Sequence, residues 1–262
     1  MLGFVEQTGR RTVRALDEIG YASSLLGESV FWTVLGQRRR QPVRAATVMT
    51  QMMQVGIDAL PIASMLAAAI GFMLAVQSLY SLGLFGAESF AHVGIALALT
   101  REFSPLIIGV LMAGRSGSAL AARLSTMSIN QEIDALRAIG VNPVRFLVAP
   151  ALIAMVVMLP AITMWANLVG LAAAGLFVSA SLDISFAAFA ASTIEVLGAG
   201  DLLHGLGKSA LFAVLIAVIA AVNGSLVKGG SEGVGRVTTR AVVHAISAII
   251  VTDMIFGFLV TG

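Results

Sequence analysis

The sequence contains no cysteine and few charged residues. The absence of cysteine excludes disulfide bonds, Fe–S clusters and metal sites built from thiolates. Charged residues make up 11% of the 262 residues and hydrophobic residues 58%, whereas soluble domains carry about 25% charged residues. Because so few charges cannot cover a water-facing surface, we predict an all-α integral membrane protein.

Long apolar runs divide the chain into five candidate transmembrane helices. Each run is long enough to cross about 30 Å of hydrocarbon at ~1.5 Å per residue. The third run is the longest and contains Pro150 and Pro160, so we expect a tilt, a kink or a membrane-parallel portion there. Residues 178–201, which follow it, predict a short helix outside the membrane. The five runs cover residues 61–85, 90–114, 146–177, 202–227 and 241–260.

Two of the loops between these runs lack positive charge altogether. The loops at 86–89 and 178–201 contain acidic residues but no lysine or arginine. All but two of the basic residues lie before the first run or in the loops at 115–145 and 228–240. Because loops rich in lysine and arginine stay in the cytoplasm, we predict a cytoplasmic N-terminus and, after five crossings, a periplasmic C-terminus. The basic character thus reflects topology and does not imply nucleic-acid binding.

Residues 1–45 have an amphipathic pattern. Apolar residues recur at near-helical spacing with charged residues between them, and Phe31 and Trp32 suit the headgroup layer of a membrane. We predict an interfacial helix that lies on the membrane and ends at the basic cluster 38–40, followed by Pro42. A soluble tail or a helix that docks on a partner protein is the alternative.

Four Lys, Arg, Asp or Glu residues fall inside the apolar runs: Arg101, Glu102, Lys208 and Asp253. An ionised group in hydrocarbon costs at least ~2.5–3.5 kcal/mol, so each needs a partner or water. Lys208 and Asp253 lie at similar depths near the outer ends of their runs, which predicts that they pair. Arg101 and Glu102 are adjacent and point about 100° apart, so one of them is expected to face a polar cavity or a second subunit. The four residues either form structural ion pairs or line a substrate cavity.

The sequence offers no catalytic or metal-binding constellation. No pair of His, Asp or Glu residues has metal-ligand spacing on one helix face, and no Ser-His-Asp set is evident. The segment GLGKS at 205–209 imitates the end of a phosphate-binding loop, but Leu202 occupies a required glycine position and no strand precedes it. We therefore predict that this chain is not an enzyme and holds no cofactor.

The loop at 114–143 is the one long polar segment between runs. It predicts a cytoplasmic helix over residues 128–140, capped by Ser128 or Asn130 and ended by Gly140. An apolar stripe on this helix alternates with charged residues, a pattern typical of a helix that docks in a partner's groove. A helix that packs under its own bundle is the alternative. The stripe consists of Ile129, Ile133, Leu136 and Ile139, and the charged residues are Glu132, Asp134 and Arg137.

Five motifs, in order along the chain, resemble those of a known family. They are REFSP at 101–105, AGRSGSA at 113–119, EIDAL at 132–136, VNP at 141–143 and TTRAVVH at 238–244. With them the chain resembles, over essentially its whole length, the MlaE/YrbE family, the permease subunits of ABC transporters that work with MCE-domain proteins. The resemblance implies a single permease domain over 1–262, with a transmembrane bundle at 61–260 and a coupling helix at 128–140.

The resemblance also implies a function and partners. In this family two permease copies form a central cavity for phospholipid, which moves between the inner and outer membranes and so maintains outer-membrane lipid asymmetry. A cytoplasmic ATPase dimer binds ATP and Mg²⁺, an MCE-domain ring lies on the periplasmic side, and a small accessory cytoplasmic subunit is a further expected partner. No nucleic acid is expected. The alternatives are an ion- or proton-coupled secondary carrier that uses the intramembrane charges, and a membrane scaffold without a transport role.

Individual residues match the family's positions. Those implied to lie in the lipid cavity or to carry intramembrane charge are Arg101, Glu102, Lys208, Asp253, Gln77, Leu79 and Tyr80. Those implied to contact the ATPase are Glu132, Asp134 and Arg137.

Overall fold

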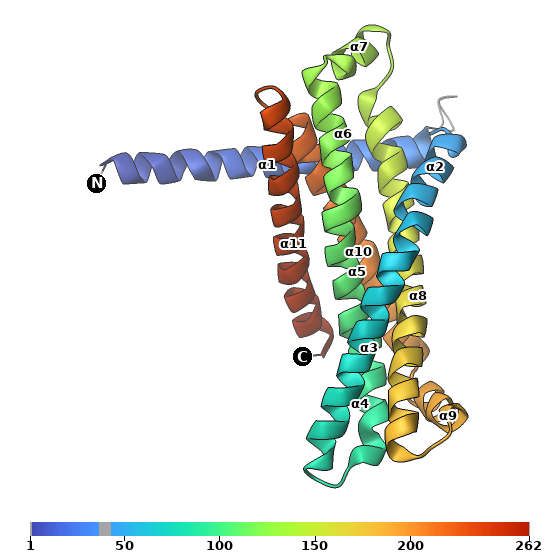
Figure 1. The fold of residues 1–262 in the computed structure, drawn as a ribbon. Helices are drawn as coiled ribbons and strands as arrows, with labels where there is room; N and C mark the ends of the chain where they lie inside the picture. The colour runs from blue at the N-terminus through green and yellow to red at the C-terminus, as the bar shows by residue number, and fades with distance from the viewer. Residues whose placement is uncertain (1, 37–42, 262) are drawn as a thin grey trace. The chain divides into compact units, whose positions relative to one another are not determined.

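The computed structural model describes residues 2–36 and 43–261, and these form helices and short connections with no strand (Figure 1). The basic cluster at 38–40 lies outside the described residues. The long helices are α1 (Leu2–Leu35), α3 (Leu60–Gly83), α8 (Ala149–Leu182), α10 (Ala199–Ser225) and α11 (Ser231–Thr261). The shorter ones are α2 (Ala45–Val55), α4 (Ala91–Ala98), α5 (Ser104–Met112), α6 (Ser118–Ile129), α7 (Glu132–Ala138) and α9 (Phe186–Val196). Single turns are η1 (Ile57–Ala59), η2 (Glu88–Phe90), η3 (Leu99–Phe103), η4 (Ala113–Gly117) and η5 (Val144–Val148).

Within the described residues, five helical stretches are long and apolar enough to cross a membrane, which confirms the predicted all-α integral membrane protein. All five begin before the predicted runs, and the second and third also end after them, because polar residues at these ends continue the helices. The second, for example, passes through the π-helical turns η3 and η4 into α6, whose Ser-Ala-Leu-Ala-Ala start consists mostly of good helix formers. The five stretches are Ala45–Gly83, Glu88–Ile129, Val144–Leu182, Ala199–Ser225 and Ser231–Leu259.

The chain forms two compact units, each assembled from separated segments. The first contains Met1–Gln51, Ala113–Ala154 and Val214–Ala245, and the second contains Met52–Met112, Met155–Ala213 and Ile246–Gly262.

In the first unit, helix α1 is anchored by its C-terminal half. Glu28 accepts a hydrogen bond from Asn142 Nδ2 at 2.6 Å, and the Arg145 guanidinium lies over the Trp32 ring, 5.4 Å from its centroid. Leu25 is buried, whereas nearer the N-terminus Val13, Leu16 and Ile19 expose their apolar side chains. The predicted N-terminal helix is confirmed, and the exposed apolar residues suit a membrane surface.

The observed helix α7 differs from the predicted cytoplasmic helix in its bounds and in its cap. Helix α6 continues to Ile129, so neither Ser128 nor Asn130 caps α7; Gln131 does so by position, in the left-handed conformation with φ 60°. The Asn130 side-chain amide instead donates to Glu132 Oε1 at 3.0 Å. The helix therefore covers Glu132–Ala138 rather than 128–140. Gly140, at φ 77°, lies in the turn that ends it, as predicted.

In the second unit, small residues let helices approach closely. A Cβ atom on Gly71 of α3 would lie 2.0 Å from the carbonyl oxygen of Gly170 in α8, so the two backbones are in direct contact. Ala67 is also buried on this side of α3. Small residues at such positions allow the close helix packing that is typical inside a membrane.

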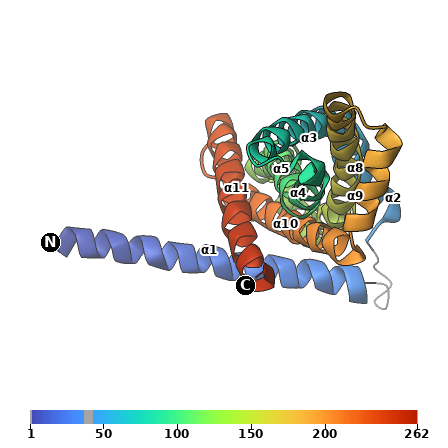
Figure 2. The same ribbon diagram turned by 90° about the horizontal axis from the view of Figure 1, so that it is seen from below.

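The third span and the segment after it can be compared with the predictions for residues 146–177 and 178–201. Helix α8 runs without interruption through Pro150 and Pro160, so neither proline ends it; a tilt or kink stays a prediction. The segment after α8 contains the predicted short helix, α9, which packs against α4 (Figures 1 and 2). Ser185 caps α9 by accepting a hydrogen bond from the Ala188 amide at 3.1 Å.

The contact between Gly71 and Gly170 gives the first prediction. Gly71→Ala should lower the thermal midpoint of the purified protein in detergent, because the added methyl group overlaps the Gly170 carbonyl, and overpacking costs about 1–3 kcal/mol. Gly94→Ala in α4 is the matched control: a Cβ there meets nothing within 4 Å, and alanine favours helix by ~1 kcal/mol. Equal midpoints for the two variants, measured by circular dichroism, would contradict the close contact.

Candidate functional site

Lys208 of α10 lies at the centre of a charge cluster in the second unit. Its side chain has no exposed surface, and Nζ contacts both the Glu102 carboxylate and Asp253 Oδ1, the latter at 3.0 Å. The Asp253 contact is an ion pair without hydrogen-bond alignment. The predicted Lys208–Asp253 pair is thus confirmed. The contact with Glu102 was not predicted.

Arg101 and Glu102 belong to the π-helical turn η3 and reach different partners on α10. Arg101 Nη1 lies 3.6 Å from Asp201 Oδ1, while Glu102 contacts Lys208 two helical turns further along α10. A π-turn widens the helix by one residue and so changes which side chains share a face; such turns are frequent at functional sites. The second carboxylate oxygen of Asp201 accepts the Gly198 amide at 3.0 Å, which fixes the start of α10.

Two cluster residues were missed by the sequence analysis: Asp201 and His204. His204 is buried; its Nε2 lies 3.7 Å from Glu102 Oε1, and its ring stands edge-on to Phe256 at a centroid distance of 5.0 Å. The signal that could have revealed them is spacing. Residues 201, 204 and 208 are separated by three and four positions, so they share one face of α10.

Close backbone packing holds the cluster together. A Cβ atom on Gly205 would lie 2.2 Å from the carbonyl oxygen of Thr100, so α10 and η3 meet without an intervening side chain. The segment GLGKS at 205–209, which imitates a phosphate-binding loop in sequence, lies inside helix α10. Its first glycine, Gly205, allows α10 to contact η3 closely. This close approach brings Lys208 within reach of Glu102.

The cluster carries an unbalanced formal charge. It contains two cations, Arg101 and Lys208, and three carboxylates, Glu102, Asp201 and Asp253, which give a formal charge of −1 with neutral His204. Lys208 is fully buried, but the Glu102 side chain is 41% exposed and that of Arg101 28%. The cluster therefore combines a buried ion pair with charged groups that remain accessible inside a membrane span, and it contains no evident nucleophile.

Comparison with known proteins identifies the family. The family model described as Permease MlaE matches residues 48–259. The chain belongs to the MlaE permease family. The permease is 30% identical to a probable ABC transporter permease protein of Rickettsia conorii, over 98% of this chain and 99% of the relative. It is 34% identical to a probable ABC transporter permease protein of Synechocystis, over 91% and 89%. It is 32% identical to the chloroplastic protein TRIGALACTOSYLDIACYLGLYCEROL 1 of Arabidopsis thaliana, over 79% and 59%.

Family membership confirms the resemblance and the coarse function. The chain is a multi-pass permease subunit of an ABC transporter, and a permease of this class implies an ATPase partner. The described residues contain no group of three or more His, Cys, Asp or Glu side chains that could hold a metal ion.

The remaining expected cavity residues of the permease lie on α3. Tyr80 is 67% exposed, and Gln77 is exposed and donates to Ser81 Oγ at 3.3 Å. Leu79, in contrast, packs against the core formed around Phe189. None of the three forms a hydrogen bond or ion pair with the charge cluster among the described residues. Their role in a lipid cavity stays a prediction.

The expected ATPase-contacting residues all lie on α7, which has no buried residue. Arg137 NH1 pairs with Asp134 Oδ1 at 3.0 Å, and both side chains are more than 60% exposed, so the pair contributes only ~0–1 kcal/mol to stability. Glu132 is also exposed. Of the predicted stripe, Ile133 and Leu136 are half-buried and Ile139 is exposed. Helix α7 thus leaves its charged residues accessible.

The central position of Lys208 gives the second prediction. Lys208→Met should strongly destabilise the permease, because breaking a buried pair leaves uncompensated charge and costs ~3–5 kcal/mol. Adding Asp253→Leu removes one of the two stranded carboxylates and should recover part of the loss. Lys228→Met, at an exposed lysine, is the matched control. Thermal unfolding of the single and double variants checks this; strictly additive effects would contradict the pairing.

Proposed function

We propose that this permease is the transmembrane subunit of an ATP-driven phospholipid transporter, which moves lipids between the inner and outer membranes of a bacterium and maintains outer-membrane lipid asymmetry. The supporting observation is the charge cluster around Lys208, whose partly exposed groups lie in spans that otherwise expose apolar surface. A phospholipid needs both features, since its headgroup is charged and its tails are apolar. Arg101 and Glu102 would contact the polar end.

The name of one relative supports a lipid cargo. The Arabidopsis protein carries the name of a glycolipid, trigalactosyldiacylglycerol. A glycolipid and a phospholipid share the diacylglycerol body, so a permease that accommodates such a body is consistent with both. We extend this to the present chain as part of the proposal.

The proposed assembly contains two copies of the permease, a cytoplasmic ATPase dimer and a periplasmic ring of MCE-domain proteins, with a small accessory cytoplasmic subunit as a further candidate. ATP and Mg²⁺ would be bound by the ATPase. The exposed helix α7, with Glu132 and Asp134 accessible, would dock on the ATPase. Gln77 and Tyr80 would border the lipid cavity formed by the two copies.

The proposed location is the inner membrane, with the N-terminus in the cytoplasm and the C-terminus in the periplasm. The loop between α6 and α8 and the loop between α10 and α11 carry the positive charge, whereas the segment around α9 carries none. This orientation places α7 on the ATPase side.

Cysteine labelling tests the orientation. Single cysteines replace Ala138, Ser231 and Ser181, all exposed positions in a chain without native cysteine. In cells with a permeabilised outer membrane, an impermeant thiol reagent should label the cysteine at 181 and spare those at 138 and 231. The opposite labelling pattern would contradict the proposed orientation.

Transport assays test the energy source. The permease and its ATPase, reconstituted in proteoliposomes, should transfer phospholipid when ATP is hydrolysed. Glu132→Lys should abolish both ATPase association and transfer, because it reverses the charge of an exposed residue at the proposed interface. Glu195→Lys, at an exposed position of α9, is the matched control.

An uncoupler in the same assay separates the proposal from an ion- or proton-coupled carrier. Transfer that persists with ATP while the proton gradient is collapsed supports the ABC transporter. Transfer that collapses with the gradient while ATP remains saturating would support the carrier.

A further inference from the structure

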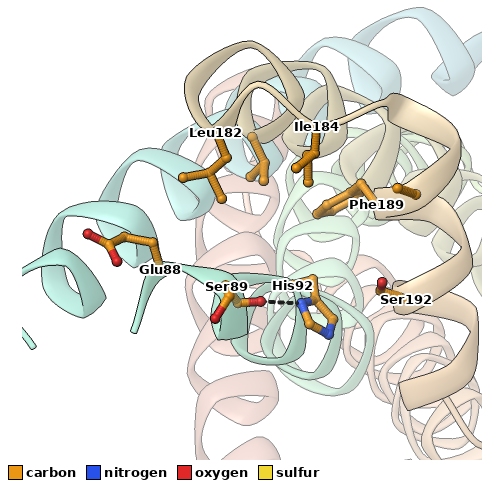
Figure 3. Close-up of a pocket in the computed structure, with 9 residues that line it drawn as sticks. Glu88, Ser89, His92, Leu182, Ile184, Phe189 and Ser192 are labelled. Atoms are coloured by element: carbon orange, nitrogen blue, oxygen red, sulfur yellow. Dashed lines mark hydrogen bonds between the residues drawn. The ribbon is translucent and has the colours of Figure 1, made fainter. Parts of the chain in front are cut away.

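The cavity of about 460 Å³ in the second unit does not bring its polar groups together (Figure 3). Glu88 and His92 both line it, but the Glu88 carboxylate is directed toward α3, where a Cβ on Gly83 would lie 3.2 Å from Oε1. His92 Nδ1 donates instead to the Ser89 carbonyl oxygen at 2.9 Å. This arrangement defines no common binding point for a ligand. A more closely defined arrangement of side chains lies in the first unit, between α1 and the end of α7.

Helix α7 has no core of its own that would fix its direction. None of its seven residues is buried, and it packs against α6. Its start follows Gln131, where the chain turns at φ 60°. Because a helix this short is not stable by itself, its direction depends on how its two ends are held. The attachment of its C-terminal end therefore decides how α7 presents Glu132 to a partner.

The C-terminal end of α7 is closed by a Schellman motif. Two backbone hydrogen bonds, of 3.0 and 2.9 Å, connect the amides of Gly140 and Val141 to carbonyl oxygens in the last turn of α7. Asn142 follows directly, and its Oδ1 accepts the Arg145 amide of η5 at 3.1 Å. The end of α7 and the start of η5 are therefore joined closely at Asn142.

The other end of the Asn142 side chain contacts α1. Its Nδ2 donates to Glu28 Oε1 at 2.6 Å, and the same oxygen accepts Trp32 Nε1 at 3.4 Å. The Arg145 guanidinium lies over the Trp32 ring, 5.4 Å from its centroid. These four residues form a closed set of contacts between α1 and the segment that follows α7. Since hydrogen bonds to a carboxylate are stronger than those between neutral groups, Glu28 is a firm point of attachment.

Helix α1 is itself held in place within the first unit. Leu25 and Ser29, on the same face as Glu28, are buried. Nearer the N-terminus, Glu18 forms an ion pair with Arg240 of α11. The attachments at positions 18 and 28 are about 15 Å apart along the helix. Because α1 is fixed at two separated points, it can hold the segment after α7 without turning with it.

We propose that α1 is a support that sets the direction of α7, and that Glu28 and Asn142 are its positioning residues. The functional consequence rests on the proposed docking of α7 on the ATPase. With the Glu28–Asn142 hydrogen bond in place, α7 presents Glu132 in one direction, and the ATPase binds a helix that is already ordered. Without that bond α7 keeps the turn that ends it but loses its attachment to α1, so association includes the cost of ordering the helix.

An exchange of the two hydrogen-bonding partners tests the proposal. Asn142→Asp keeps an oxygen for the Arg145 amide but sets a second carboxylate against Glu28, so it should break the contact at neutral pH. Adding Glu28→Gln restores a donor, because the amide at position 28 then donates to the carboxylate at position 142.

Two measurements on the full-length permease in nanodiscs follow the exchange. Affinity for the partner ATPase, measured by biolayer interferometry, should fall about tenfold in Asn142→Asp, which corresponds to ~1.4 kcal/mol, and should recover in the double variant. Hydrogen exchange at the amides of residues 132–138, measured without the ATPase, should become faster in Asn142→Asp and return toward the wild-type rate in the double variant.

Two further variants separate the possible failures. Gly71→Ala lowers the thermal midpoint without changing α1 or α7, so it should leave ATPase affinity unchanged. Unchanged affinity and exchange in Asn142→Asp, together with lost association in Glu132→Lys, would overturn the support role and leave the docking of α7 standing. An equal loss in Asn142→Asp and in the double variant would also overturn it. If Glu132→Lys associates normally, the docking proposal fails, and hydrogen exchange still decides whether α1 positions α7.

Discussion

A buried lysine imposes the main constraint on this structure. Lys208 has no exposed surface and lies in an apolar membrane span. Its charge must therefore be balanced by carboxylates from other helices. Glu102 and Asp253 form ion pairs with Lys208, and these pairs connect α10 to η3 and α11. Gly205 permits this by bringing α10 against the backbone at Thr100. A side chain at position 205 would separate the lysine from Glu102 and leave buried charges unpaired.

The same region shows why charge in a membrane span is informative about function. The cluster has three carboxylates and two cations, and the side chains of Arg101 and Glu102 remain accessible, so it is not a fully enclosed set of ion pairs. The π-turn η3 contributes by directing Arg101 and Glu102 to Asp201 and Lys208. An accessible charged surface inside an apolar span is suited to an amphiphilic ligand, in line with the lipid cargo proposed for this family member.

Packing between the helices combines large buried side chains with direct backbone contact at small residues. In lipid the hydrophobic effect does not drive helices together, so close approach at small residues such as Gly71 and Gly170 replaces it. The core around Phe189 shows the contribution of side chains, because apolar residues from α3, α4, α8 and α9 fill it.

The sequence by itself determined the five spans, the amphipathic first helix, the short helix α9 and the family, because apolar length and ordered motifs are local properties of the chain. The similar depths of Lys208 and Asp253 in their spans also predicted that these two residues pair. The spacing of Asp201 and His204 from Lys208 indicates a shared helix face, but the sequence did not show which partners these residues reach, nor did it show the Glu102–Lys208 contact. The rotation of each helix about its axis decides these, and an apolar span that is hydrophobic all round carries little signal of that rotation. The cap of α7 was also decided by structure, since α6 extended to Ile129 and occupied the predicted cap positions. Only the tertiary structure, through the π-turn and the glycine contacts, brought these residues together.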